Sequence, residues 1–120
     1  MCVKRRQRVS AGGSGLGAIF TPTGFGTELA AGKETRSFGG RTCLLEEAIH
    51  ADVALIKAYK ADELGNLVYY KTARNFNPLM AMAADTVIAE VDEIVPVGAL
   101  DPECIVTPHM FVDILTMKGA

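Results

Sequence analysis

The chain has 120 residues, which is enough for one domain but not for two. Its hydrophobic fraction of 49% is high for an independent small domain. The chain is therefore either a compact protein around a buried sheet or a piece of a larger assembly whose apolar surface needs a partner, and the second interpretation is favoured. It contains no run of about 18 apolar residues, which excludes a membrane-spanning helix.

Charge is unevenly placed along the chain. Its formal net charge is −2, yet Lys4, Arg5, Arg6 and Arg8 lie near the start and the remainder is net acidic. Such a run can mark a nucleic-acid-binding arm, but no basic surface and no interleaved aromatic residues follow it. The glycine-rich stretch 11–17 is a poor apolar segment for a signal peptide. We therefore expect residues 1–10 to be a disordered or non-native basic leader, with no nucleic-acid partner.

The three cysteines, Cys2, Cys43 and Cys104, are odd in number and widely spaced. This pattern is typical of reduced thiols and not of a disulfide framework. It predicts a cytoplasmic protein.

The first predicted elements follow a glycine-rich loop at residues 12–17, where other groups can approach the main chain closely. Residues 28–31 predict a helical turn that Gly32 ends. Residues 33–38 and 41–46 flank Gly39 and Gly40, which predicts a tight hairpin. A nearly continuous apolar run at 53–59 is typical of a buried sheet strand. A turn at 62–66 and a strand at 67–70 follow.

A short helix is predicted next, at about residues 78–84. Asn77 precedes Pro78, and asparagine is a preferred N-cap while proline is preferred at the first helical position. A helix start offers free N–H groups and partial positive charge, so it can hold an anion. The alternative is that Asn77 only caps its helix.

The last elements are predicted strands at 86–91, 94–97 and 111–117, with a turn or short helix at 101–103. The predicted fold is a mixed, strand-rich α/β open sheet with few short helices.

Three weak motifs give little support to other functions. Residues 13–18 fit the loose dinucleotide pattern G-x-G-x-x-G/A, but they lack the preceding strand and the following long helix. Glu46 and Glu47 are adjacent on a predicted strand, so they point to opposite faces and do not share a site. His50, Cys104 and His109 are too sparse for a zinc site. No nucleophile elbow is present.

Several blocks in series resemble the A subunit of class I CoA-transferases of the 3-oxoacid type. Residues 12–17 and 21–27 resemble its glycine loop, and residues 44–49 and 51–58 are similar to its next strands. Residues 65–67 with the Ala73-Arg74-Asn75-Phe76-Asn77-Pro78 motif form the most distinctive block. Residues 93–95 and 105–108 extend the likeness, which covers about residues 11–118 in order.

The resemblance implies that residues 11–120 are the C-terminal part of an A-subunit domain with its N-terminal half missing. The family moves CoA from an acyl-CoA to a carboxylate such as acetate, acetoacetate, succinate or 3-oxoadipate. A glutamate of the B subunit, in a Ser-Glu-Asn-Gly motif, attacks the thioester and becomes a glutamyl-CoA thioester. That motif is absent here, so this chain is expected to be inactive alone.

The resemblance also implies partners and site residues. The expected partners are a B subunit, in a heterodimer or heterotetramer, an acyl-CoA and a carboxylic acid; CoA enters as a substrate thioester, with no bound cofactor or metal. Matching positions predict a site wall or subunit interface formed by Thr21, Thr23, Gly24, Gly26, Arg74, Asn75, Phe76 and Asn77. Arg74 either pairs with a substrate carboxylate or forms a structural salt bridge. The alternative function is an inactive truncated subunit that serves only as a structural or interaction fragment.

Overall fold

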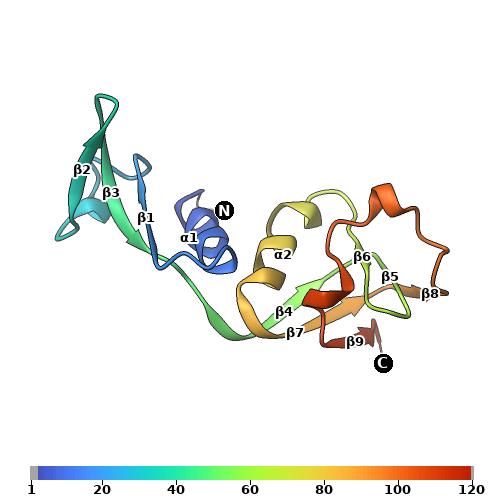
Figure 1. The fold of residues 1–120 in the computed structure, drawn as a ribbon. Coiled ribbons are helices and arrows are strands. Elements are labelled where there is room, and N and C mark those ends of the chain that lie inside the picture. Colours follow the sequence, from blue (N-terminus) through green and yellow to red (C-terminus); the bar gives the residue numbers. More distant parts are fainter. Residues whose placement is uncertain (1–2, 120) are drawn as a thin grey trace. The chain divides into compact units, whose positions relative to one another are not determined.

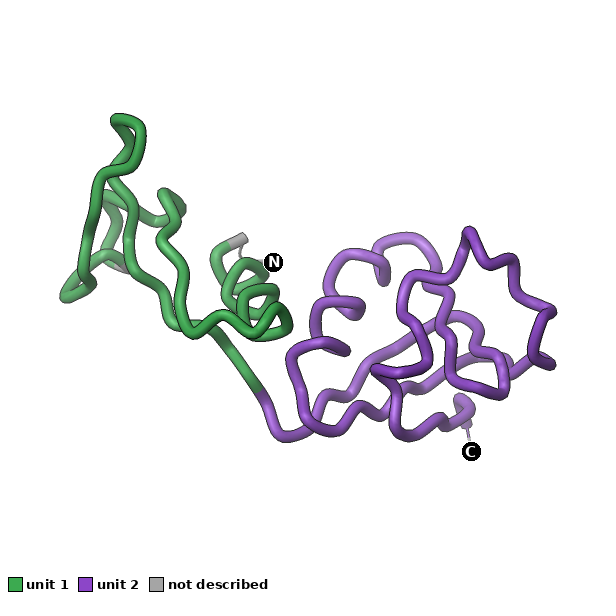
Figure 2. Tube along the Cα trace, viewed as in Figure 1, with its two compact units in different colours: residues 1–50 green, residues 51–120 purple. Residues whose placement is uncertain are grey.

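The computed structural model describes residues 3–119, which form two compact units divided between residues 50 and 51 (Figure 2). The architecture is mixed α/β with short helices, as predicted, but the strands form three separate three-stranded sheets and not one open sheet (Figure 1). Neither α-helix in the described part of the chain is long and apolar enough to cross a membrane.

The first unit is an antiparallel sheet with one helix. Helix α1 spans Val3–Gly13, and strands β1 (Ala18–Thr21), β2 (Thr35–Phe38) and β3 (Arg41–Glu47) pair in the order β1-β3-β2. The predicted hairpin is confirmed: Gly39 and Gly40 have φ of 55° and 79° between β2 and β3. Two successive positive φ values suit the twist of a tight hairpin. The predicted helical turn is the 3-10 helix η1 (Glu28–Ala30).

The expectation of a disordered leader is wrong. The basic residues near the start belong to α1, whose Lys4 and Ala11 are buried in the first unit. Residues at positions 4, 8 and 11 recur on one face of a helix, so this face can turn toward the sheet although it carries charges. Cys2 lies outside the described residues.

The second unit contains a parallel sheet and a smaller mixed sheet. Strands β4 (Ala51–Lys57), β7 (Ala84–Val91) and β9 (Ile114–Met117) are parallel, in the order β4-β7-β9. Helix α2 (Ala73–Met82) lies in the connection from β4 to β7, since parallel neighbours need a crossover. Strands β5 (Lys60–Asp62), β6 (Leu67–Val68) and β8 (Glu93–Val95) form the order β6-β5-β8.

Most predicted strands of the second unit are confirmed, with shifted ends. The strand expected at 53–59 starts at Ala51 and ends at Lys57, and the last strand starts at Ile114 and not at residue 111. The last strand starts later than predicted because residues before it form the 3-10 helix η3 (His109–Phe111), which follows Pro108. The predicted turn or short helix at 101–103 is the 3-10 helix η2 (Pro102–Cys104), capped by the side chain of Asp101.

The core of the second unit lies on one face of the parallel sheet. Ala54, Ile56, Val87, Ala89 and Val91 alternate along β4 and β7 and pack with Ala81 of α2 and with the small sheet. Figure 1 shows α2 lying along β4 and β7. The residues between them point to the opposite face, so β4 is buried on one side only, although its apolar run had predicted a strand buried throughout.

Candidate functional site

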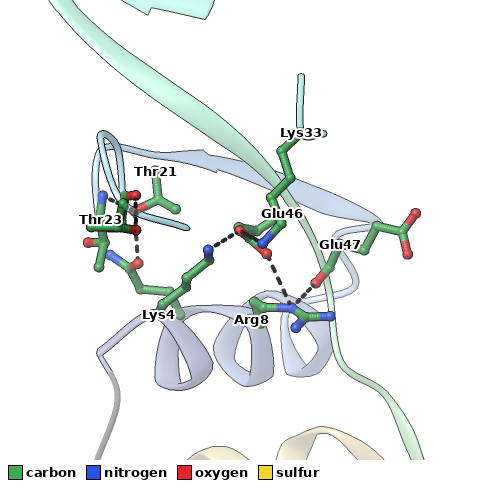
Figure 3. Close-up of polar contacts among 10 residues, drawn as sticks. Lys4, Arg8, Thr21, Thr23, Lys33, Glu46 and Glu47 are labelled. Atoms are coloured by element: carbon green, nitrogen blue, oxygen red, sulfur yellow. Dashed lines mark hydrogen bonds and ion pairs between the residues drawn. The ribbon is translucent and has the colours of Figure 1, made fainter. Parts of the chain in front are cut away.

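The first candidate block, the loop at residues 21–27, is held onto α1 by threonine side chains. Thr21 is buried at the end of β1, and its Oγ1 donates to Gln7 Oε1 at 2.8 Å and accepts from Thr23 N at 3.2 Å. Thr27 Oγ1 donates to Gly24 O at 2.6 Å and closes the loop. Figure 3 shows Thr21 and Thr23 close to each other. The loop is therefore a preformed element whose shape is set by local hydrogen bonds.

Two glycines of this loop have backbone conformations that other residues rarely adopt. Gly24 and Gly26 have φ of 89° and 79°. A Cβ atom at Gly24 would lie 3.4 Å from Lys4 Nζ, whereas a Cβ at Gly26 would meet nothing within 4 Å. Gly24 therefore rests on the buried lysine, while Gly26 lies at the exposed part of the loop.

A buried carboxylate in the first unit, that of Glu46, contacts three cationic side chains. Glu46 on β3 is 3% exposed and contacts Lys4 Nζ at 2.5 Å, Lys33 Nζ at 2.6 Å and Arg8 Nε at 3.8 Å (Figure 3). Arg8 Nε also donates to Glu47 O at 2.7 Å. The prediction that Glu46 and Glu47 point to opposite faces is confirmed, because Glu47 is exposed. We call Lys4, Arg8, Lys33 and Glu46 the buried ion cluster.

Electrostatics keep the buried ion cluster charged. Burial raises the pKa of Glu46, but the hydrogen bond from Lys33 and the contact with Lys4 outweigh burial, so the pKa lies below its ordinary value. The hydrogen bond to Glu46 raises the pKa of Lys33. A carboxylate that is buried and shared by three cations is not free to attack a thioester or to take up a proton near neutral pH. The cluster is therefore structural.

The second candidate block, Ala73 to Pro78, is the beginning of α2. The helix begins at Ala73, not at residue 78, so Asn77 is not its N-cap and Pro78 lies inside the helix. Backbone N–H groups of Ala73, Arg74 and Asn75 already donate to carbonyl oxygens of residues 70–72. The predicted anion-ready helix start at Pro78 is therefore wrong, because that position is interior and the actual first turn already has acceptors.

Asn77 has a different role, which the capping pattern concealed. Its Oδ1 accepts from Lys57 N at 3.0 Å at the end of β4, and its Nδ2 donates to Ala73 O at 3.0 Å. One side chain thus ties α2 to the edge strand of the parallel sheet. Pro78 has no N–H to donate to the carbonyl of Arg74, four residues earlier, so it weakens the helix ladder at that point. The two hydrogen bonds of the Asn77 side chain hold the same turn in place.

The other residues of this block differ in exposure. Arg74 and Asn75 are exposed, whereas Phe76 and Asn77 are half-buried. Arg74 Nε donates to Tyr69 O at 3.3 Å, and no ion pair of Arg74 is found among residues 3–119. The structural salt bridge that the sequence left open is therefore not formed within the described chain.

A charged cluster that the sequence did not indicate lies at the carboxyl edge of the parallel sheet. Lys57 Nζ, at the end of β4, contacts Glu90 Oε1 at 3.1 Å and Asp92 Oδ1 at 2.8 Å. The hydrogen bond to Asp92 raises the pKa of Lys57, and the same bond lowers the pKa of Asp92. Beside it lies a cavity of about 410 Å³, lined by Leu55, Ile56, Lys57, Asn77, Ile88, Glu90 and Thr116.

The two predicted blocks fall in different units: Thr21, Thr23, Gly24 and Gly26 belong to the first, and Arg74 to Asn77 belong to the second (Figure 2). Each block is built within its own unit. Among the described residues no group of three or more His, Cys, Asp or Glu side chains is arranged to hold a metal ion. Cys43 is a buried free thiol and Cys104 an exposed one.

Comparison with known protein sequences gives a match along almost the whole chain. The family described as Coenzyme A transferase matches residues 4–118, and the chain belongs to it. The A subunit of 3-oxoadipate CoA-transferase from Pseudomonas putida is 58% identical over 115 residues, which are 95% of this chain and 50% of that protein. The A subunit of succinyl-CoA:3-ketoacid coenzyme A transferase from Helicobacter pylori is 58% identical over 106 residues, 88% of this chain and 46% of that protein. The chain thus spans about half the length of these relatives.

Solved structures have the same fold. An acyl-CoA transferase (YdiF) from Escherichia coli O157:H7 superposes with a TM-score of 0.82 at 20% identity, over 95% of this chain and 26% of that one. A decarboxylase, AibA/AibB, superposes with a TM-score of 0.75 at 34% identity, over 95% of this chain and 43% of that one. The family match begins at residue 4 and so includes most of α1, where the resemblance in sequence had been expected to be poor.

Proposed function

Because the chain belongs to the coenzyme A transferase family, we propose that it forms part of the A subunit of an enzyme that moves CoA between an acyl-CoA and a short-chain carboxylic or 3-oxo acid. The observation that carries this proposal is the identity of more than half of its aligned residues to transferase A subunits along nearly its full length. The acid belongs to the acetate, acetoacetate, succinate or 3-oxoadipate class. We place residues 11–120 in the C-terminal part of that polypeptide and the protein in the cytoplasm.

The proposed reaction uses a nucleophile from a partner B subunit. A B-subunit glutamate attacks the acyl-CoA carbonyl carbon and expels the CoA thiolate, giving an acyl–glutamyl anhydride. The thiolate then attacks the glutamyl carbonyl and releases the carboxylate product, giving a glutamyl-CoA thioester, and the acceptor acid reverses both steps. Two buried carboxylates of this chain, Glu46 and Asp62, are already engaged by cations or by N–H donors. This engagement supports a nucleophile supplied from outside the chain.

The residues of this chain are proposed to shape the site or the contact with the B subunit. The loop at 21–27 offers an exposed glycine backbone on a rigid support, which suits close approach of a ligand or partner. Arg74 and Asn75 lie at the start of α2, and Arg74 is proposed to pair with the carboxylate of the acid substrate. Phe76 is proposed to contribute to the same wall, and Asn77 to hold the helix in place.

The first experiment mixes the purified chain with a B subunit, and the acetoacetyl-CoA formed from succinyl-CoA and acetoacetate is measured. We expect no turnover by the chain alone and stable co-elution with the B subunit. Clear turnover without a B subunit would contradict the mechanism. Co-elution without turnover would favour the alternative of an interaction fragment, which the half-length coverage of the relatives supports.

A second experiment separates CoA transfer from decarboxylation, because the decarboxylase AibA/AibB has the same fold. Residues 4–118 replace the matching segment of the Pseudomonas putida relative, and this chimera is assayed with its B subunit for acyl-CoA exchange and for CO2 release. Arg74→Ala is expected to raise KM for the acid roughly tenfold with an unchanged Tm, as expected for one lost charge-assisted contact. Arg41→Ala, an exposed arginine outside both blocks, is the control. Release of CO2 without CoA transfer would refute the proposal.

A further inference from the structure

The charges of the buried ion cluster do not balance. One carboxylate, that of Glu46, contacts three cations, so the cluster carries a surplus of two positive charges. Charges inside proteins are normally paired, because an unpaired charge away from water is costly. The rest of the first unit does not offset this surplus, since residues 1–50 contain seven lysines and arginines but four glutamates, a formal net charge of +3. The cluster can therefore accept an anion from outside the described chain.

A cavity in the first unit opens at the two cations of this cluster that reach solvent. It has a volume of about 310 Å³ and is lined by Arg8, Gly32, Lys33, Glu34, Leu45, Glu46 and Glu47. The side chains of Arg8 and Lys33 are about one-third exposed, whereas Lys4 is buried and does not line the cavity. A volume of this size lies at the lower end of the range for small-molecule sites, so a small ligand fits it.

The two other glutamates of the lining direct their carboxylates elsewhere. Glu47 follows Glu46 on β3, so its side chain lies on the opposite face of the sheet. Its carbonyl oxygen accepts from Arg8 Nε at 2.7 Å, and Figure 3 shows its carboxylate pointing away from Arg8. Glu34 Oε1 lies 3.6 Å from Nη2 of Arg36, in an exposed pair. Positive charge therefore dominates the cavity.

The two cations at the cavity also have hydrogen-bond donors to spare. A guanidinium has five N–H groups and an ammonium has three. Arg8 donates through Nε to Glu47 O, and no hydrogen bond of its terminal nitrogens is found among residues 3–119. Lys33 Nζ donates to Glu46 Oε1 at 2.6 Å, which uses one of its three donors. A planar guanidinium beside a compact ammonium is a donor set that suits phosphate.

We propose that this cavity binds a phosphate group between Arg8 and Lys33, while Glu46 holds the two cations in place. A phosphate monoester carries about 1.5 to 2 negative charges at neutral pH, so it matches the surplus of the cluster better than a carboxylate with one charge. The phosphate is either the free inorganic ion or part of a small ester, and the test separates these sources. The inference does not rest on CoA transfer, so it can fail while the proposed function stands.

Isothermal titration calorimetry of the purified chain with sodium phosphate measures the binding. Sodium chloride of equal ionic strength is the blank, because salt alone screens exposed charges. Tm should rise by about 5 °C at a phosphate concentration ten times the Kd. Lys33→Gln and Arg8→Gln should each raise the Kd roughly tenfold or more, as expected for one lost charge-assisted contact. Arg41→Gln is the matched control, because it removes the same charge from an exposed position of β3 that does not line the cavity.

The outcomes distinguish phosphate binding from general salt effects and from loss of folding. Each variant is compared with itself in chloride, and Lys33→Arg, which keeps the charge, should keep the binding; it leaves a readable variant if the glutamine variants do not fold. Tighter binding of 3′-AMP than of inorganic phosphate, with none of adenosine, assigns the site to an ester, and the reverse order assigns it to the free ion. Equal Tm in phosphate and chloride, equal Kd values for Lys33→Gln and Arg41→Gln, or binding of acetate as tight as that of phosphate would overturn the proposal.

Discussion

Replacing Glu46 by glutamine should destabilise the first unit far more than an equivalent change at an exposed ion pair. Glu46→Gln removes the carboxylate that Lys4 contacts, and the two side chains are 3% and 7% exposed. Breaking a fully buried pair typically costs about 3–5 kcal/mol. Arg8 and Lys33 are about one-third exposed, and water there screens their charges. We therefore expect about 2–3 kcal/mol, below the fully buried value.

Thermal unfolding followed by far-UV circular dichroism measures this cost. For a small domain, 2–3 kcal/mol corresponds to a fall in Tm of roughly 10–20 °C. Glu34→Gln is the matched control, because its pair with Arg36 joins side chains that are 56% and 61% exposed and should contribute at most about 1 kcal/mol. Tyr59, Tyr69 and Tyr70 all lie in the second unit, so tyrosine fluorescence reports that unit separately. Equal shifts for Glu46→Gln and Glu34→Gln would refute the assignment of a buried ion cluster.

The remaining predictions concern pH, the contact of α1 with the segment after β3, and an anchoring amide. Glu46 and Asp62 both have a lowered pKa in the folded chain, from ordinary values of 4.5 and 3.8, so the stability they contribute is complete above those values and is lost as pH falls through the folded pKa. Tm measured from pH 7 to 3 should therefore fall below about pH 4.5, and less steeply in Glu46→Gln. A Tm independent of pH would contradict this. Gly12→Ala should destabilise the first unit despite the helix preference of alanine, because the new Cβ would overlap with the carbonyl oxygen of Ile49. Gly17→Ala is the control, since a Cβ there meets nothing within 4 Å and should be tolerated. Equal losses of stability for the two variants in urea unfolding would refute the clash. Asn77→Ala should lower the free energy of unfolding by about 1–3 kcal/mol, because it leaves Lys57 N without its acceptor. Asn75→Ala on the same helix should be near neutral. The reverse order of the two variants in thermal unfolding would show that Asn77 is not the anchor.

The elements that the sequence predicted well are those whose determinants are local. Gly39 and Gly40 specify a two-residue turn whatever surrounds them, and the hairpin formed there as expected. The alternation of Glu46 and Glu47 follows from strand geometry alone, and it too was confirmed. The family resemblance, carried by several short blocks in series, agrees with the matched family.

The errors arose where tertiary contacts override a local pattern. Asn77 and Pro78 look like a helix start, but the helix begins at Ala73, and the Asn77 amide bonds to β4 and to the preceding turn instead of capping the helix. The basic start looks like a solvated leader, but a distant glutamate on β3 recruits Lys4 and Arg8 into a buried contact. A pair of cations four residues apart gives no sign in the sequence of the carboxylate 38 to 42 positions later that they bind.

The high hydrophobic fraction of the chain can now be traced to particular strands. An independent domain of this size hides its apolar residues in one core, yet Leu55, Ile88 and Ile114 form a row on the side of the parallel sheet opposite to that core. The β4 run that predicted a fully buried strand therefore contributes to both faces of the sheet, and the second unit covers one of them. The surplus of apolar residues in the composition therefore lies in part in this row, on the face that the second unit leaves exposed.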